Sequence, residues 1–210
     1  MENLAPNNKR IVKNTLLLYV RMLFLMVVSL YTSRVVLNAL GIEDFGIYNV
    51  VGGMVAMFSM LSGSLSAAIT RFITYELGRG DREKLRTIFS SAVTIQLGLA
   101  AIIIILAEVL GIWFLNSKMT IPLDRLAAAN WVFQFSVLTF AINLVSVPYN
   151  ASIIAHERMS AFAYISIFEA VGKLAIAYLI TISPIDRLVF YAILMCAVAL
   201  IVRFTYGIYC

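Results

Sequence analysis

The 210-residue sequence is poor in charge, cysteine and histidine. Charged residues make up 13% of the chain, where an ordinary globular protein carries about 25%. The two cysteines, Cys196 and Cys210, have no metal-ligand partners at useful spacing and predict no disulfide framework. The one histidine, His156, lies in a charged segment without acid–base partners, and no nucleophile–base pair or phosphate-binding loop is recognisable. We therefore expect no catalytic residue, no metal site and no cofactor.

Apolar residues are abundant instead. They make up 62% of the sequence, and the mean hydropathy is +0.94. The apolar segments are long and continuous, unlike the runs of about ten alternating residues in membrane barrels. This composition predicts an all-α fold, a polytopic bundle of membrane helices. The net charge of +5 includes no basic run with interleaved aromatic residues, so we expect no nucleic-acid partner.

Polar interruptions divide the apolar sequence into six expected spans. A cytoplasmic segment over residues 1–14 precedes a six-helix transmembrane lobe over residues 15–210. The lengths suit helices that cross a bilayer, which needs about 20 apolar residues. The expected spans are residues 15–40, 46–76, 87–114, 126–155, 159–182 and 188–210.

Basic residues are unequally divided between the two sides of these spans. Eight fall on the side of the N-terminus, namely Lys9, Arg10, Lys13, Arg79, Arg82, Lys84, Arg86 and Arg158. Three fall on the other side, namely Lys118, Arg125 and Arg187. Since short cytoplasmic loops carry the excess of basic residues, both termini are predicted to be cytoplasmic.

The first span carries two arginines. Arg21 and Arg34 are separated by the charge-free residues 22–33. An arginine that faces lipid is costly, so intramembrane charges usually face a bundle interior or an aqueous cavity. The alternative is that each side chain snorkels to the head groups near one end of the helix. An inward-facing Arg21 is a candidate cation for an anionic ligand.

Glycines and other small residues mark the second span. Gly41 and Gly46 frame a segment short enough to predict an abrupt reversal of the chain. Small residues then recur at steps of three and four, which places them on one face of a continuous helix and predicts close packing against another helix. These residues are Gly52, Ala56, Ser59, Gly63, Ser66 and Thr70.

The fifth span contains an acid and a base. Glu169 and Lys173 are four residues apart with the acid first, the favourable order for a helical ion pair. Mutual neutralisation inside the bundle is one interpretation, and ion or proton coupling is the other.

Several short segments resemble one family. The sequence resembles bacterial polysaccharide-biosynthesis flippases, the O-antigen and lipid-linked oligosaccharide exporters of the multidrug/oligosaccharidyl-lipid/polysaccharide superfamily. The likeness runs over nearly the whole chain. The residues that carry it are Leu40-Gly41, Phe45-Gly46, Tyr48, residues 66–71 and Gly78-Arg79-Gly80-Asp81 with Lys84 and Leu85.

The resemblance implies two lobes around a central cavity that opens alternately to each leaflet of the bacterial inner membrane. Six spans correspond to the N-terminal lobe, so we expect a fragment of a longer transporter, with a second lobe or a second chain as partner. The implied substrate is a lipid-linked oligosaccharide with a polyprenyl-pyrophosphate head group, surrounded by membrane lipids. Its cationic ligands would be Arg21, then Arg34, then Arg71 near the cytoplasmic mouth.

Two other functions stay open. A drug or cation antiporter of the same superfamily would favour inward acids, of which the spans offer Glu169, close to Lys173. A non-transporting membrane assembly subunit would need no charge in a cavity.

Overall fold

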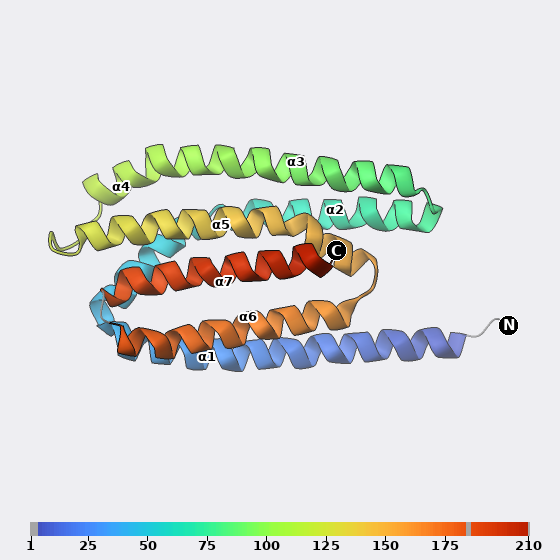
Figure 1. Ribbon diagram of the computed structural model, residues 1–210, viewed down its shortest axis with the longest axis horizontal. Coiled ribbons are helices and arrows are strands. Elements are labelled where there is room, and N and C mark those ends of the chain that lie inside the picture. Colours follow the sequence, from blue (N-terminus) through green and yellow to red (C-terminus); the bar gives the residue numbers. More distant parts are fainter. Residues whose placement is uncertain (1–3, 184–185, 210) are drawn as a thin grey trace.

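The computed structural model describes the backbone of residues 4–183 and 186–209, and the side chains of residues 12, 14–59, 63–183 and 186–209. These residues form helices joined by short turns, which confirms the predicted all-α class (Figure 1). The α-helices are α1 (Leu4–Ala56), α2 (Ser59–Arg79), α3 (Arg82–Leu106), α4 (Ile112–Ser117), α5 (Leu126–Ala155), α6 (Met159–Leu179) and α7 (Arg187–Tyr209). A π-helical turn, η1 (Ala107–Gly111), joins α3 to α4, and a 3-10 turn, η2 (Ile180–Ile182), follows α6.

The long helices lie side by side along one axis (Figure 1). Helix α5 packs against α2, α3 and α7, while α6 packs against α1. The start of α1, the α2–α3 turn, the α5–α6 turn and the end of α7 lie at one end of the bundle, which we call the terminal end (Figure 1). The bend in α1, the α4–α5 loop and the α6–α7 turn lie at the other, the far end (Figure 1).

Five helical segments are long and apolar enough to cross a membrane. They are Asn14–Ala56, Arg82–Ser117, Leu126–Ala155, Met159–Ile182 and Arg187–Tyr209. Many large apolar side chains point out of the bundle, Leu16 and Leu30 among them with 63% and 68% exposure. Outward apolar side chains are what a helix bundle presents to lipid. The structure is that of a polytopic membrane helix bundle.

The connection between the first two expected spans differs from the prediction. The chain does not reverse within residues 41–46, because it bends once at Gly41 (φ 84°, ψ 171°) and then continues as helix to Ala56. A second break at Met57 and Phe58 separates this segment from α2. Gly41 adopts its backbone angles without the steric penalty that a Cβ would bring. The reversal is therefore made in two steps, with residues 42–56 as the connecting helical segment (Figure 1).

The small-residue face of the second span is also different from the prediction. The break at Met57 and Phe58 interrupts it, and Ala56, Ser59 and Gly63 are exposed. A Cβ added at Gly63 would meet nothing within 4 Å. The prediction that another helix packs closely against this face is therefore wrong for the described part of this chain. The buried apolar residues described within residues 46–76 are larger ones instead, namely Ile47, Val51, Val55 and Ile73.

The tightest packing is between η1 and α5. Phe133 of α5 is 1% exposed and belongs to the largest buried apolar cluster, together with Leu115, Val132 and Leu188. Its ring lies directly over Gly111, where an added Cβ would overlap the ring atoms. Gly111 therefore permits a close approach of the two helices at this level.

Candidate functional site

A groove of about 380 Å³ lies between α1, α6 and α7, and we call it the α1–α6 groove. Helix α1 contributes Arg21, Leu25, Val28, Ser29, Thr32, Ser33, Val36, Phe45, Tyr48 and Asn49. Helix α6 contributes Ser166, Glu169, Ala170 and Lys173, and α7 contributes Tyr191. Residues on each helix recur at steps of three and four, which is the spacing of one helical face. The groove brings together three of the five residues predicted to bind a ligand or form an ion pair.

Arg21 lies at one end of this set, partly buried against α6. Its guanidinium carbon is 4.3 Å from the centroid of the Phe162 ring. A cation over an aromatic face is stabilised by the negative face of the ring. The Nε atom of Arg21 is buried and has no hydrogen-bond partner among the described residues. The side chain is thus held in place by an apolar ring and keeps donor capacity for a ligand.

Glu169 and Lys173 face the same groove as an ion pair. The Lys173 Nζ lies 2.6 Å from Oε1 of Glu169, with the two side chains 41% and 34% exposed. Their spacing of four residues places them one turn apart on α6. The groove's single acid among its described lining residues is therefore already bound by a base.

Arg34 and Arg71 lie outside the α1–α6 groove, and both side chains are exposed. Arg34 follows Arg21 by 13 residues, so at about 100° per residue it sits roughly 140° away around α1. Arg71 belongs to α2, which does not line the groove. The structure thus separates these two arginines from Arg21.

Hydroxyl, amide and phenol groups line the groove, and the sequence analysis did not single them out. Thr32 has a buried Oγ1 with no hydrogen-bond partner in the described structure. Asn49 donates to the Phe45 carbonyl at 2.8 Å, and the rings of Tyr48 and Tyr191 meet edge-on at 4.7 Å. The available signal was helical spacing, since Thr32 lies 11 residues after Arg21 on the same face.

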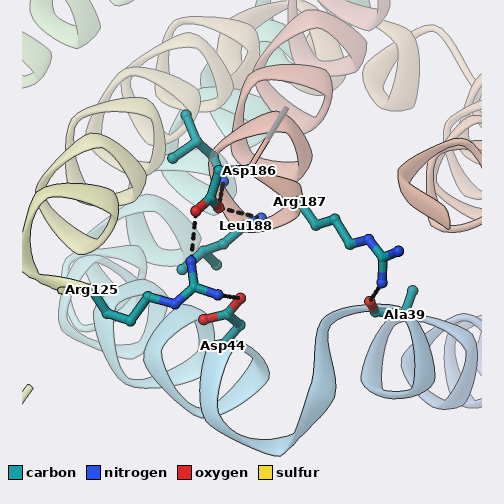
Figure 2. A network of polar contacts seen from close by, with 7 residues as sticks. Ala39, Asp44, Arg125, Asp186, Arg187 and Leu188 are labelled. Carbon is teal, nitrogen blue, oxygen red and sulfur yellow. Dashed lines mark hydrogen bonds and ion pairs between the residues drawn. The ribbon is translucent and has the colours of Figure 1, made fainter. Parts of the chain in front are cut away.

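A second polar network closes the far end of the bundle (Figure 2). Arg125, before α5, donates to Asp44 at 2.9 Å and to Asp186 at 2.6 Å. Asp186 also accepts from the backbone N–H of Leu188 at 3.0 Å, at the start of α7. Arg187 donates to the Ala39 carbonyl at 3.1 Å, beside the bend in α1 (Figure 2). We call the Asp44–Arg125–Asp186 network the far-end clamp, because it joins three segments.

The geometry defines a class of protein. A helical bundle of apolar segments whose interhelical groove carries charged, hydroxyl and amide side chains defines the class of polytopic membrane proteins with a polar path between helices, where intramembrane charges usually mark ligand or ion pathways. The described residues contain no group of three or more acids, histidines and cysteines that would hold a metal ion.

Comparison with known proteins agrees with this class. The MatE family profile matches residues 19–179, which is most of the chain, so the protein belongs to the MatE family. MatE proteins are membrane transporters of the multidrug/oligosaccharidyl-lipid/polysaccharide exporter superfamily and are not enzymes.

One curated relative is the uncharacterized membrane protein EpsK of Bacillus subtilis (strain 168), which is 22% identical over 124 residues. The aligned region covers 59% of this chain and 24% of EpsK, so the chain matches about a quarter of that relative's length. No solved structure matches.

Proposed function

We propose that the chain forms part of a transporter that flips a lipid-linked oligosaccharide across the bacterial inner membrane by alternating access. The cargo would be a polyprenyl-pyrophosphate glycan for the biosynthesis of surface polysaccharide such as lipopolysaccharide. One observation carries the proposal, namely the charge state of the α1–α6 groove. Its acid, Glu169, is neutralised by Lys173 at 2.6 Å, whereas Arg21 has a buried donor without a partner in the described structure.

This charge distribution suits an anionic head group. A pyrophosphate that enters a region with little water needs cationic donors, and arginine offers a planar fork that matches phosphate oxygens. Phe162 holds the Arg21 guanidinium in place, so less side-chain freedom is lost when a ligand binds. Arg34 and Arg71 stay predicted ligands, because their exposed side chains are free to meet the head group from outside the groove.

The proposed transporter includes a second lobe or a second chain. The chain matches about a quarter of EpsK, and alternating access needs two bodies that rock against each other around a site. We propose that the head group binds between this bundle and that partner, with both termini of the bundle in the cytoplasm. The orientation rests on the eight basic residues of one side against three of the other.

The test is complementation of cells whose own flippase is deleted, with surface glycan as the readout and the protein expressed with whatever gene product completes it. We expect Arg21→Ala to reduce surface glycan at least tenfold and Arg21→Lys to reduce it less, since lysine cannot reproduce a bidentate contact. Lys118→Ala, in an exposed loop, is the matched control. Normal surface glycan from Arg21→Ala at an equal protein level would remove Arg21 from the mechanism.

The antiporter alternative predicts a different pattern. If the groove carries a cationic drug, Glu169 becomes the essential residue and Glu169→Gln abolishes transport, while Arg21→Ala improves cation binding by removing a like charge. Efflux of a fluorescent cation from the same cells distinguishes the two. A non-transporting assembly subunit would leave both readouts unchanged by either substitution.

A further inference from the structure

A separate pocket of about 620 Å³ opens at the terminal end of the bundle, and we call it the α2–α3 pocket. It does not share a lining residue with the α1–α6 groove. Its walls come from the end of α2, the start of α3 and the end of α5. They are formed by Ile73, Glu76, Leu77, Gly80, Asp81, Arg82, Leu85, Arg86, Phe89, Tyr149, Ser152 and His156.

Glu76 is the unusual residue of this pocket. Its side chain lines the pocket although the residue is only 8% exposed. Its Oε2 is buried and has no hydrogen-bond partner in the described structure. A buried carboxylate oxygen without a donor is costly, and a charged donor is the group that compensates best. The pocket therefore offers a site for an ammonium group.

The other acid of the pocket is already engaged. Asp81 caps the start of α3, where it accepts from the backbone N–H of Lys84 at 3.1 Å and pairs with the Lys84 Nζ at 3.3 Å. The backbone N–H of Lys84 is also the main reason that the pKa of Asp81 lies below its ordinary value. Glu76 is thus the pocket's available carboxylate.

Cationic side chains stand at the edge of the same pocket. Arg82 and Arg86 are exposed and lie one turn apart on α3, so both line one side. His156 lines the pocket from the end of α5. Two guanidinium groups on one face form a typical phosphate site. The pocket combines an inner acid with outer bases.

Apolar side chains complete the walls. The rings of Phe89 and Tyr149 meet at 84° with centroids 5.2 Å apart, and Ile73, Leu77 and Leu85 line the pocket beside them. On the outer side of α2, Phe72 and Tyr75 are each 59% exposed. Aromatic residues at the end of a membrane helix lie at the level of the lipid head groups.

We propose that the α2–α3 pocket binds a zwitterionic phosphoethanolamine head group, supplied by phosphatidylethanolamine of the surrounding membrane. The ammonium donates to Glu76, the phosphate accepts from Arg82 and Arg86, and the acyl chains leave along the apolar side of α2. Phosphatidylcholine has an ammonium without N–H donors, and the hydroxyl groups of phosphatidylglycerol are uncharged donors, so neither offers Glu76 a charged hydrogen-bond donor. This site lies apart from the groove of the proposed function and does not depend on it.

The experiment uses the purified chain in detergent micelles with dioctanoyl phospholipids, and measures binding by microscale thermophoresis and adducts by native mass spectrometry. We expect dioctanoyl phosphatidylethanolamine to bind about tenfold or more tightly than the choline and glycerol lipids, because choline has no N–H donor and the glycerol hydroxyls are neutral donors. Free phosphoethanolamine should bind much more weakly than the lipid. Equal binding of free phosphoethanolamine would overturn the membrane as the source, and equal binding of all three lipids would overturn the site.

Substitutions locate the binding. Glu76→Gln keeps the shape and removes the charge, and it should abolish the preference for the ethanolamine lipid. Arg86→Ala, at an exposed position, should weaken the binding of the ethanolamine and glycerol lipids alike, because both carry phosphate. Glu83→Gln, exposed in the first turn of α3 and outside the pocket, is the control that should change nothing. If folded Glu76→Gln keeps the preference for the ethanolamine lipid, the proposed contact of Glu76 is excluded. If Arg86→Ala binds the phospholipids as tightly as the unaltered chain, the proposed contact of Arg86 is excluded.

Discussion

Arg21 illustrates how a single residue is accommodated in an apolar helix. Its guanidinium lies 4.3 Å from the ring centroid of Phe162, and a desolvated cation–π contact contributes about 2 kcal/mol. That energy offsets part of the cost of an intramembrane charge, which is several kcal/mol. Under the proposed function, a bound anion would offset a further part of that cost. The ring contact thus stabilises the Arg21 side chain, and its Nε donor keeps no partner among the described residues.

The far-end clamp leads to a prediction for Arg125. Replacing it with methionine leaves Asp44, whose side chain is 7% exposed, without a cation, and breaks the contact to Asp186 as well. We expect Arg125→Met to lower the free energy of unfolding by about 2 kcal/mol, less than for a fully buried pair because Arg125 is partly exposed. Thermal unfolding of the purified protein, followed by tryptophan fluorescence, measures the change.

Lys118→Met is the control for this prediction, since Lys118 is exposed in the same region and forms no ion pair with a described residue. Equal melting temperatures for the two variants would show that the far-end clamp contributes nothing to stability.

At the residue scale, the sequence predicted some positions and not others. The order and spacing of Glu169 and Lys173 predicted a helical ion pair, whereas the cost of an intramembrane charge left Arg21 with two interpretations, facing inward or snorkelling. The separation of Arg34 from Arg21 was also readable, because 13 residues do not return to the same helical face. The far-end clamp could not be read from the sequence, since Arg125 lies 81 residues from Asp44 and 61 residues from Asp186 along the chain. Contacts over such distances depend on the packed bundle.

Two glycines determine the shape and packing of individual helices. Gly41 makes the bend in α1 through its positive φ of 84°, and Gly111 lets η1 approach Phe133. The small residues after Gly46 instead remain helical and exposed or partly exposed. Sequence spacing shows that small residues share a face, but not whether a neighbouring helix covers that face. This is why the predicted packing surface was wrong within this chain.

Gly63 tests the exposed face directly. A side chain added there meets nothing within 4 Å, so Gly63→Leu should not destabilise this chain, and the better helix propensity of leucine should raise its free energy of unfolding by about 0.5–1 kcal/mol. The measurement is the yield and melting temperature of the purified chain. A large loss of folded protein would show that the face is covered. Gly53→Leu, equally open in α1, serves as the comparison.

Gly111 should respond in the opposite way. A methyl group at this position overlaps the ring of Phe133, so Gly111→Ala is expected to destabilise the protein by about 1–3 kcal/mol through overpacking. Gly98→Ala is the matched control on α3, because nothing lies within 4 Å of a Cβ there, and it should gain about 0.5–1 kcal/mol from helix propensity. Chemical unfolding of both variants gives the two free energies. Equal effects would show that the close approach is absent.

The whole molecule has two distinct ends. The start of α1 and the end of α7 share the terminal end with the α2–α3 turn (Figure 1). The long apolar segments predicted the helical class, and the basic residues predicted an orientation. The predicted span over residues 46–76 differs most from the structure, because Met57 and Phe58 divide it between α1 and α2, and α2 is not among the five described segments that meet the length and hydropathy of a span. The place of α2 in the bundle depends on packing against α5.

The orientation is tested with single cysteines at Asp81 and Asp124 in a background where Cys196 and Cys210 are serine. Asp81 lies between α2 and α3 at the terminal end, and Asp124 lies before α5 at the far end. We expect an impermeant thiol reagent added outside intact cells to label position 124 and not position 81, since the terminal end carries the basic excess. Labelling of both positions from outside would overturn the topology, and labelling of position 81 alone would invert it.

If the bundle rocks as the proposed function requires, the far-end clamp is the natural place for the pivot. It ties the helical segment after Gly41 to the starts of α5 and α7, whereas α1 extends from that point along the bundle to the terminal end (Figure 1). At 1.5 Å per residue, the roughly 27 residues from Gly41 back to Asn14 make a lever of roughly 40 Å. A tilt of about 5° at the pivot would move its free end by roughly 3–4 Å. Since α1 packs along α6, the two helices would tilt together under the proposed function, and Arg21, 20 residues from Gly41, would move by roughly 2–3 Å.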